Sequence, residues 1–317
     1  MRLALFHRIS EGATGAVYPG LYFDDGVLDY QELVKEMDHH SPQSLMVDII
    51  DHFDALRPDL ERLARRGRRI PFQEVRLRAP LPRPGKMLNC IGNYWEHQSR
   101  DPRPLNMFLK SPDAVIGPDD TIVLPNFTEP YVFQHEAELG VVIKGPAKEV
   151  SRANWRKAVF GYTCVIDVSA RAEGRSTWRQ GSWMGKSFDT FGPVGPCILT
   201  ADEVDDPNNL EVKFWNSGEL YHNYSTNDME HRVPELIEWA STLMTLNSGD
   251  IISCGTNHEG LGPLQDGDTA EIEVQGVGKL TVGVRDPLKR SWPRGVYVGP
   301  NSTNPATVAA RAAGQGR

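Results

Sequence analysis

The chain has 317 residues with a formal net charge of −8 at pH 7, and 24% of its residues are charged. This acidity argues against binding along the phosphate backbone of a nucleic acid. No run approaches the roughly 20 apolar residues of a membrane-spanning helix. Residues 1–10 contain no long apolar core, so we expect no signal peptide. A chain of this length can form one large and one small domain.

The first 85 residues predict a small N-terminal domain followed by a linker. Apolar positions across residues 31–65 follow the period of a helix, interrupted by Pro58. Four prolines within residues 71–85 indicate a linker. We therefore predict an N-terminal domain over residues 1–80 and a larger second domain over residues 86–290.

The larger domain combines one clear helix with many strand signals. Pro234 suits the first turn of a helix over residues 234–246, which Gly249 follows. Apolar runs bounded by glycine and proline predict strands over residues 121–124, 139–143, 162–166, 250–253 and 270–274. Many short strands with few helices predict a β-rich α+β fold, built as a sandwich or a roll. We expect the tail, residues 291–317, to be loosely ordered or to pack against a partner subunit.

The cysteines indicate a reducing environment. They lie far apart, form no CxxC pair and lack the clustered spacing of a zinc site. We predict that they are small buried residues of a cytoplasmic protein. The four are Cys90, Cys164, Cys197 and Cys254.

Three acidic residues within apolar segments are candidate ligands of a metal ion. On a strand, Glu136 and Glu138 would point to the same face. Two neighbouring carboxylates repel each other inside a fold unless a cation lies between them. Asp167 ends a second apolar segment. Together the three would form an oxygen site suited to Mg²⁺, Mn²⁺ or Ca²⁺.

The same acids also have a purely structural explanation, which the spacing leaves open. Glu136 and Glu138 are compatible with a solvent-facing strand edge. Asp167 is compatible with a turn cap. Sequence spacing alone does not bring the three side chains together in space.

Six segments, taken in order, resemble motifs of the fumarylacetoacetate hydrolase superfamily over most of residues 86–286. They are Gly92-Asn93-Tyr94-Trp95-Glu96-His97, Phe108-Leu109-Lys110-Ser111-Pro112, Glu136-Ala137-Glu138-Leu139, the stretch from Gly161-Tyr162-Thr163 to Asp167-Val168-Ser169-Ala170-Arg171, residues 185–196 (GKSFDTFGPVGP) and residues 248–256 (SGDIISCGT). Each segment is weak evidence by itself, but the shared order of all six is a strong signal.

The resemblance implies a mixed β-sandwich roll, usually a homodimer, with one divalent metal ion per subunit. It implies that Glu136, Glu138 and Asp167 bind the ion, which we expect to be Mg²⁺ or Mn²⁺, with Ca²⁺ as a third candidate. His97 takes the position of the family's catalytic histidine, and Lys186 would bind the substrate or stabilise an oxyanion. Candidate substrate contacts are Tyr94, Lys110, Arg171 and Thr256.

Three departures from the family pattern lie around the expected pocket. Arg100 stands where smaller members have a glutamate that orients the catalytic histidine, and Glu96 and Asp101 are candidate substitutes. Ala172 replaces an aspartate, and Asn257 replaces a proline after the Gly-Thr pair. These changes leave the substrate and the reaction more open than the fold or the metal.

The expected activity is metal-dependent cleavage of a carbon–carbon bond in a 2,4-dioxo acid of the acylpyruvate type, as in the catabolism of aromatic compounds. The ion would act as a Lewis acid, neutral His97 would take a proton from water, and Lys186 would offset negative charge. The expected partner is a small 2-oxo or dioxo acid, with no nucleic acid or membrane involved. The same site would also suit a 2-oxo acid decarboxylase, a tautomerase, a lyase or a dehydratase. A non-catalytic binding protein is disfavoured because all three expected ligands are present.

Structural alternatives remain for several of these residues. Lys186 is compatible with a surface lysine, and Arg171 with an ion pair in the core. His135 should point away from the acids on a strand, which makes it structural or at most a support for a ligand. His258 lies close to Thr256 but shows no pattern that assigns it a role.

Overall fold

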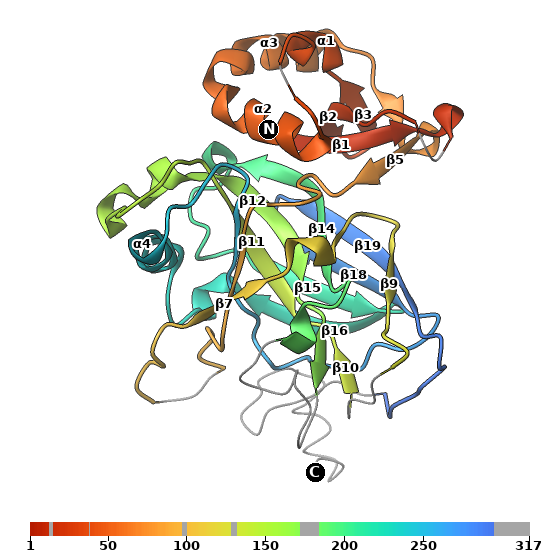
Figure 1. Ribbon diagram of the computed structural model, residues 1–317, viewed down its shortest axis with the longest axis vertical. Coiled ribbons are helices and arrows are strands. Elements are labelled where there is room, and N and C mark those ends of the chain that lie inside the picture. Colours follow the sequence, from red (N-terminus) through yellow and green to blue (C-terminus); the bar gives the residue numbers. More distant parts are fainter. Residues whose placement is uncertain (13–14, 38, 97–99, 128–131, 172–183, 295–317) are drawn as a thin grey trace.

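A computed structural model describes residues 1–12, 15–37, 39–96, 100–127, 132–171 and 184–294 of the chain (Figure 1). Strands predominate and α-helices are few, which confirms the prediction of a β-rich α+β fold. No helix in these ranges is both long and apolar enough to cross a membrane.

The first and larger sheet passes through the whole molecule. Its order from edge to edge is β4-β3-β2-β1-β14-β12-β11-β17-β6-β7, with β5 paired to β1 and β8 to β14. The strands that the larger part of the chain contributes to this sheet are β6 (Met87–Cys90), β7 (Met107–Lys110), β8 (Val115–Ile116), β11 (Ala137–Ile143), β12 (Val159–Ile166), β14 (Gly192–Thr200) and β17 (Ile251–Ser253). The strands β11, β12 and β14 are buried along their whole length, as expected for strands covered on both faces.

A second sheet packs on the first and closes the core of the larger part. Its order is β16-β15-β18-β19-β9, and β15, β18 and β19 contact β11, β12 and β14. Apolar side chains of both sheets, such as Leu139, Tyr162, Phe214 and Ile272, form one buried cluster between them. The strands of this sheet are β9 (Thr121–Val123), β15 (Glu211–Asn216), β16 (Glu219–Ser225), β18 (Thr269–Val274) and β19 (Gly278–Arg285).

Two smaller elements complete this part of the fold. The strands β10 (Val132–Gln134) and β13 (Ser169–Arg171) pair as a separate ribbon beside the ends of β11 and β12. Helix α4 (Val233–Leu243) packs on the 3-10 helix Arg152–Ala158. The helix begins with Pro234 in its first turn, as predicted, but ends at Leu243. The five strands that we predicted in this part correspond to β9, β11, β12, β17 and β18.

The N-terminal part forms the red and orange layer at the top of Figure 1. Its strand β1 pairs with β14, so this part continues the large sheet. Its elements are β1 (Arg2–Arg8), β2 (Tyr18–Phe23), β3 (Gly26–Asp29), α1 (Gln31–Val34), α2 (Pro42–Asp51), α3 (Phe53–Arg66), β4 (Ile70–Pro71) and β5 (Val75–Arg78).

Two local predictions for this part were wrong. The helical segment is interrupted at His52, between α2 and α3, while Pro58 lies inside α3. A proline removes one hydrogen bond from a helix, and burial of Phe53 and Leu60 on the same helix offsets that cost. The expected linker contains strand β5, which pairs with β1. The prolines of this linker thus flank a strand.

Packing of Phe160 joins the N-terminal helices to the large sheet. Phe160 on β12 meets Phe53 of α3 edge to face, with ring centroids 5.1 Å apart. Replacing Phe160 with alanine should lower the free energy of unfolding by about 3–5 kcal/mol, because the lost ring leaves a cavity. The measurement is chemical denaturation. The matched control is Phe127→Ala, since Phe127 is 74% exposed. Equal effects of the two substitutions would contradict this account of the packing.

All four cysteines are free and buried, as predicted. Burial raises the pKa of the thiols of Cys164 and Cys254 well above the ordinary value, so both stay protonated at neutral pH. They act as small apolar residues of the core.

Candidate metal centre and active site

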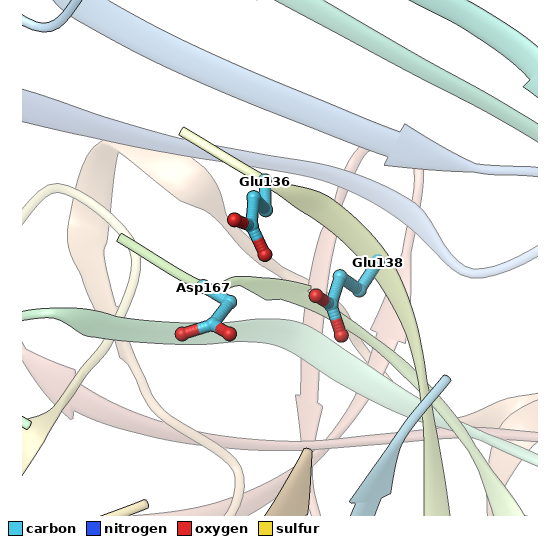
Figure 2. Close-up of side chains that lie close together, drawn as sticks. All are labelled: Glu136, Glu138 and Asp167. Atoms are coloured by element: carbon cyan, nitrogen blue, oxygen red, sulfur yellow. The ribbon is translucent and has the colours of Figure 1, made fainter. Parts of the chain in front are cut away.

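The antiparallel pairing of β11 with β12 brings the three predicted acids together. Ala137 lies opposite Ile166, so Glu136 and Asp167 meet just beyond the ends of the two strands. The backbone N–H of Asp167 donates to the carbonyl oxygen of Glu136 over 2.8 Å. One carboxylate oxygen from each of Glu136, Glu138 and Asp167 lies within 4.8 Å of the others (Figure 2). All three side chains are buried, which excludes a solvent-facing strand edge.

Hydrogen bonds fix only one of the two carboxylate oxygens of Glu138. Its Oε2 accepts hydrogen bonds from the Ser253 hydroxyl and, over 3.0 Å, from the Gly255 backbone N–H. Its Oε1 is buried and has no hydrogen-bond partner within the described ranges. A buried carboxylate oxygen without a partner costs free energy unless a proton or a cation occupies it. This oxygen is therefore available for an ion.

Two lysines and one arginine surround the acids. Lys186 Nζ donates to Glu136 Oε2 over 2.7 Å, to Asp167 Oδ2 over 3.0 Å and to the Ser169 hydroxyl over 2.6 Å. Lys110 Nζ donates to Asp167 Oδ1 over 2.8 Å, and Arg171 pairs with Glu136 Oε1. Lys186 is thus a buried lysine of this centre, which excludes the surface alternative.

These charges push the pKa values of neighbouring groups in opposite directions. Burial opposes ionisation of Glu136, but Lys186 and Arg171 outweigh it and hold the pKa of Glu136 well below its usual range. Burial, together with the nearby charges of Asp167 and Glu136, raises the pKa of Glu138 well above its usual range. Without an ion, the site therefore favours a protonated Glu138 beside an ionised Glu136.

The lysines also differ from each other. Burial is the largest influence on both and disfavours their charged forms. For Lys186, the carboxylates of Asp167 and Glu136 outweigh burial and raise its pKa. For Lys110, burial prevails over Asp167 and lowers its pKa. Lys186 is therefore the more firmly charged of the two.

The donor set fits a hard divalent cation. It offers only oxygen ligands, three of them carboxylates, and a Glu138 oxygen that has no protein partner. Mg²⁺, Mn²⁺ and Ca²⁺ prefer such ligands, whereas zinc sites in proteins use mainly nitrogen and sulfur. Three protein ligands also leave coordination positions for water or a substrate.

The remaining predicted site residues lie at different distances from this centre. Lys110 and Arg171 contact the acids directly. Tyr94 is fully buried and packs edge to face on Tyr224, whose hydroxyl donates to the Ala137 carbonyl. Thr256 is buried beside Gly255. His97 lies outside the described residues, as do Ala172 and residues 295–317 of the predicted tail.

The two departures from the family pattern that lie in the described ranges both form polar contacts. Arg100 and Arg103 bind the carboxylate of Glu230 together. Asn257 donates to Asp228 Oδ2 over 3.0 Å. Arg100 therefore takes part in an ion-pair cluster and supplies no acidic partner for a histidine.

His135 lies between β10 and β11, and its ring contacts aromatic and histidine side chains of the core. Its ring stacks on Phe214 with centroids 4.0 Å apart, and its Nδ1 lies 3.1 Å from Nε2 of His222. Burial, followed by the neighbouring His258, lowers the pKa of His222 to about 4. Burial, followed by the neighbouring His222, also holds the pKa of His135 well below its usual range. Both rings are neutral at pH 7 and support the core behind Glu136.

Sequence reasoning missed several residues of the site. Ser169 bridges Lys186 and Glu136, and Ser253 bonds Glu138, although both stand inside motifs that we identified. The carboxylate of Glu96 binds the ring of His258, which had no assigned role. A serine that follows a predicted ligand by two residues on a strand is the only signal that the sequence offered for Ser169.

The geometry can be compared with known proteins. Residues 89–285 match the fumarylacetoacetate (FAA) hydrolase C-terminal domain. A maleylpyruvate hydrolase of Aquipseudomonas alcaligenes is 30% identical over 283 residues, which make up 84% of this chain and 96% of that protein. A mitochondrial oxaloacetate tautomerase of Bos taurus is 37% identical over 228 residues, or 67% of this chain and 70% of that protein.

A solved structure resembles almost the whole chain. It is the crystal structure of maleylpyruvate hydrolase from Sphingobium sp. SYK-6 in complex with manganese(II) ion and pyruvate. The two chains are 35% identical and superpose with a TM-score of 0.78, over 90% of this chain and 99% of that one. The similarity therefore includes the N-terminal part as well as the metal centre.

Proposed function

Because the chain belongs to the fumarylacetoacetate hydrolase family, we propose that it is a divalent-metal-dependent hydrolase that cleaves a carbon–carbon bond in a 2,4-dioxo acid of the acylpyruvate type. One observation carries the proposal: the chain has a buried triad of carboxylates, and a relative that is 35% identical binds manganese(II) and pyruvate. Hydrolysis of an acylpyruvate releases pyruvate. The proposed role lies in the breakdown of aromatic compounds, and the proposed assembly is a homodimer.

In this proposal Glu136, Glu138 and Asp167 hold Mg²⁺ or Mn²⁺, with Ca²⁺ as a third candidate. When bound, the ion would act as a Lewis acid toward the oxygens of the 2-oxo acid. The three carboxylates carry a charge of −3, so a divalent ion would leave them at −1. The partner is a small 2-oxo or dioxo acid.

The other proposed roles belong to side chains of the chain itself. Lys186 bonds two of the three carboxylates and would offset negative charge on a substrate carboxylate or an oxyanion. Arg171 is partly exposed beside Glu136 and is a candidate anchor for a substrate carboxylate. Lys110, Tyr94 and Thr256 remain candidate pocket residues, and His97 is the proposed base for the attacking water.

A second function is favoured by two observations. The bovine relative that is 37% identical is an oxaloacetate tautomerase. Arg100 binds Glu230 and cannot orient His97 as a glutamate would. Both favour a tautomerase or a decarboxylase, in which no water molecule attacks the substrate.

A substrate panel distinguishes the two functions. Purified protein with Mn²⁺ is incubated with acetylpyruvate, maleylpyruvate, fumarylpyruvate and oxaloacetate, and the products are identified by NMR. We expect pyruvate and a carboxylic acid in equal amounts from at least one acylpyruvate. His97→Ala should lower that turnover about 10²- to 10⁴-fold, which is the rate enhancement that general acid–base catalysis usually contributes. His40→Ala, an exposed histidine of the N-terminal part, is the control.

Conversion of oxaloacetate alone would replace the hydrolase with the second function. Turnover that persists in the presence of excess EDTA would contradict the metal-dependent mechanism in either form. Unchanged turnover in His97→Ala would remove that residue from the proposed mechanism.

A further inference from the structure

Glu96 and His258 form a carboxylate–histidine pair that the resemblance does not assign. Glu96 accepts a hydrogen bond from Nδ1 of His258 and, over 3.2 Å, another from the backbone N–H of the same residue. Burial opposes ionisation of Glu96, but the hydrogen bonds from His258 prevail and lower its pKa. Glu96 therefore stays a carboxylate at neutral pH.

Hydrogen bonds to Asp228 fix the positions of both loops that carry the pair. The backbone N–H of Glu96 donates to Asp228 Oδ2 over 3.1 Å, and Asn257 Nδ2 donates to the same oxygen over 3.0 Å. Asp228 thus ties the loop of Glu96 to the loop of His258. Glu96 itself has a φ of 54°, a left-handed conformation that a glutamate keeps only where its surroundings enforce it.

The pair lies beside the metal centre. His258 follows Gly255, which binds Glu138, by three residues. It is also close enough to Glu136 to help lower the pKa of that carboxyl. The charged or titratable groups around the pair also include Arg100 and Arg103 near Glu96, and Asp228 and His222. Glu259 directly follows His258 in the chain.

One ring nitrogen of His258, Nε2, is available for proton transfer. Because Nδ1 binds Glu96, the ring orientation is fixed, and Nε2 faces away from that carboxylate. Nε2 forms no hydrogen bond with any residue of the described ranges, and 31% of the side chain is exposed. A carboxylate that orients a histidine whose second nitrogen is free is the arrangement that active sites use for proton transfer.

We propose that His258, held by Glu96, is the general acid that delivers a proton to the carbon released in the reaction. This inference rests on the proposed function and adds a second proton carrier to it. In the hydrolysis, His97 takes a proton from water, and the hydroxide adds to the carbonyl carbon next to the methylene group. The carbon–carbon bond then breaks, and its electron pair passes to the methylene carbon of the 2-oxo acid. Nε2 of His258 protonates that carbon, so the products are a carboxylic acid and pyruvate, and solvent restores both histidines.

The protonation step can be measured without the unknown substrate. A residue that protonates C3 of the product must also remove a proton from C3 of pyruvate in the reverse direction. Wild-type protein with Mg²⁺ and pyruvate in D₂O should therefore exchange the methyl protons of pyruvate, as followed by ¹H NMR. His258→Gln should slow this exchange by about 10²-fold or more. His40→Ala, which changes an exposed histidine of the N-terminal part, should retain the exchange.

The positioning role of Glu96 has its own readout. Glu96→Gln should slow the exchange less than His258→Gln does, and the double variant should be no slower than His258→Gln alone. The matched control is His231→Gln. His231 is also a partly exposed histidine next to a glutamate, with Nδ1 3.4 Å from Glu235, but it lies outside the proposed site.

The outcomes separate this inference from the proposed function. Exchange within threefold of wild type in His258→Gln, or no exchange by the wild type, would overturn the inference. Exchange without cleavage of any acylpyruvate would reject the proposed hydrolase activity. The exchange rate of His258→Gln would still test whether His258 transfers the proton. If His258→Gln also loses its stabilisation by Mn²⁺, the test of the inference is the exchange rate of Glu96→Gln. An unchanged exchange rate in Glu96→Gln would overturn the proposed role of the Glu96–His258 pair.

Discussion

Replacing Glu138 with glutamine should abolish both turnover and the stabilisation of the protein by Mn²⁺. The substitution keeps the shape of the side chain but removes the carboxylate whose Oε1 has no protein partner. For wild type, Mn²⁺ at about 100 times its dissociation constant should raise the free energy of unfolding by about 2.7 kcal/mol. The variant should gain almost nothing. The measurement is thermal unfolding with and without the ion.

The same substitution should change how the metal-free protein responds to pH. The pKa of Glu138 is raised in the folded state by burial and by Asp167 and Glu136. Between the unfolded and the folded pKa, the folded state binds more protons, so stability falls as the pH rises through that window. Glutamine cannot ionise, so the variant should lose this contribution and be more stable than metal-free wild type at pH 8.

The control for both experiments is Glu211→Gln, which changes an exposed residue at the start of β15 and should alter neither the metal response nor the pH dependence. A full Mn²⁺ shift in Glu138→Gln would contradict the assignment of this carboxylate as a ligand. A metal-free pH dependence identical to that of wild type would contradict its raised pKa.

Replacing Lys186 with methionine should strongly destabilise the metal-free protein. Lys186 Nζ bonds Glu136, Asp167 and Ser169 in a buried centre. Removing one partner of a buried ion pair leaves the other charge uncompensated, which costs about 3–5 kcal/mol. Denaturation in the presence of EDTA measures this loss. Turnover should be lost as well, because no cation would then balance the substrate carboxylate.

Mn²⁺ should restore part of the stability of this variant. The ion supplies positive charge to the same carboxylates, so the shift caused by Mn²⁺ should be larger in Lys186→Met than in wild type. Lys213→Met is the matched control, since Lys213 pairs with Glu211 on the solvent-facing side of β15, and this change should leave the melting temperature unchanged. A smaller Mn²⁺ shift than in wild type would show that Lys186 is needed to assemble the metal centre.

The strands and the acids of the site were predicted because their signals are local. The apolar runs of β11, β12 and β17 are short, continuous and bounded by turn residues, so each can be found within its own segment. The order of six motifs then pointed to Glu136, Glu138 and Asp167 before their positions were known. Comparison with relatives supports the family, while the roles of the individual residues remain proposals.

The sequence by itself thus determined the β-rich fold, the buried cysteines and the candidate triad. Tertiary structure alone decided which polar groups serve that triad, because the contacts join distant parts of the chain. Ser253 meets Glu138 across 115 positions, and His258 meets Glu96 across 162. No local pattern of hydrophobicity or spacing records such pairs, since they arise only when β17 pairs with β11 on one side and with β6 on the other.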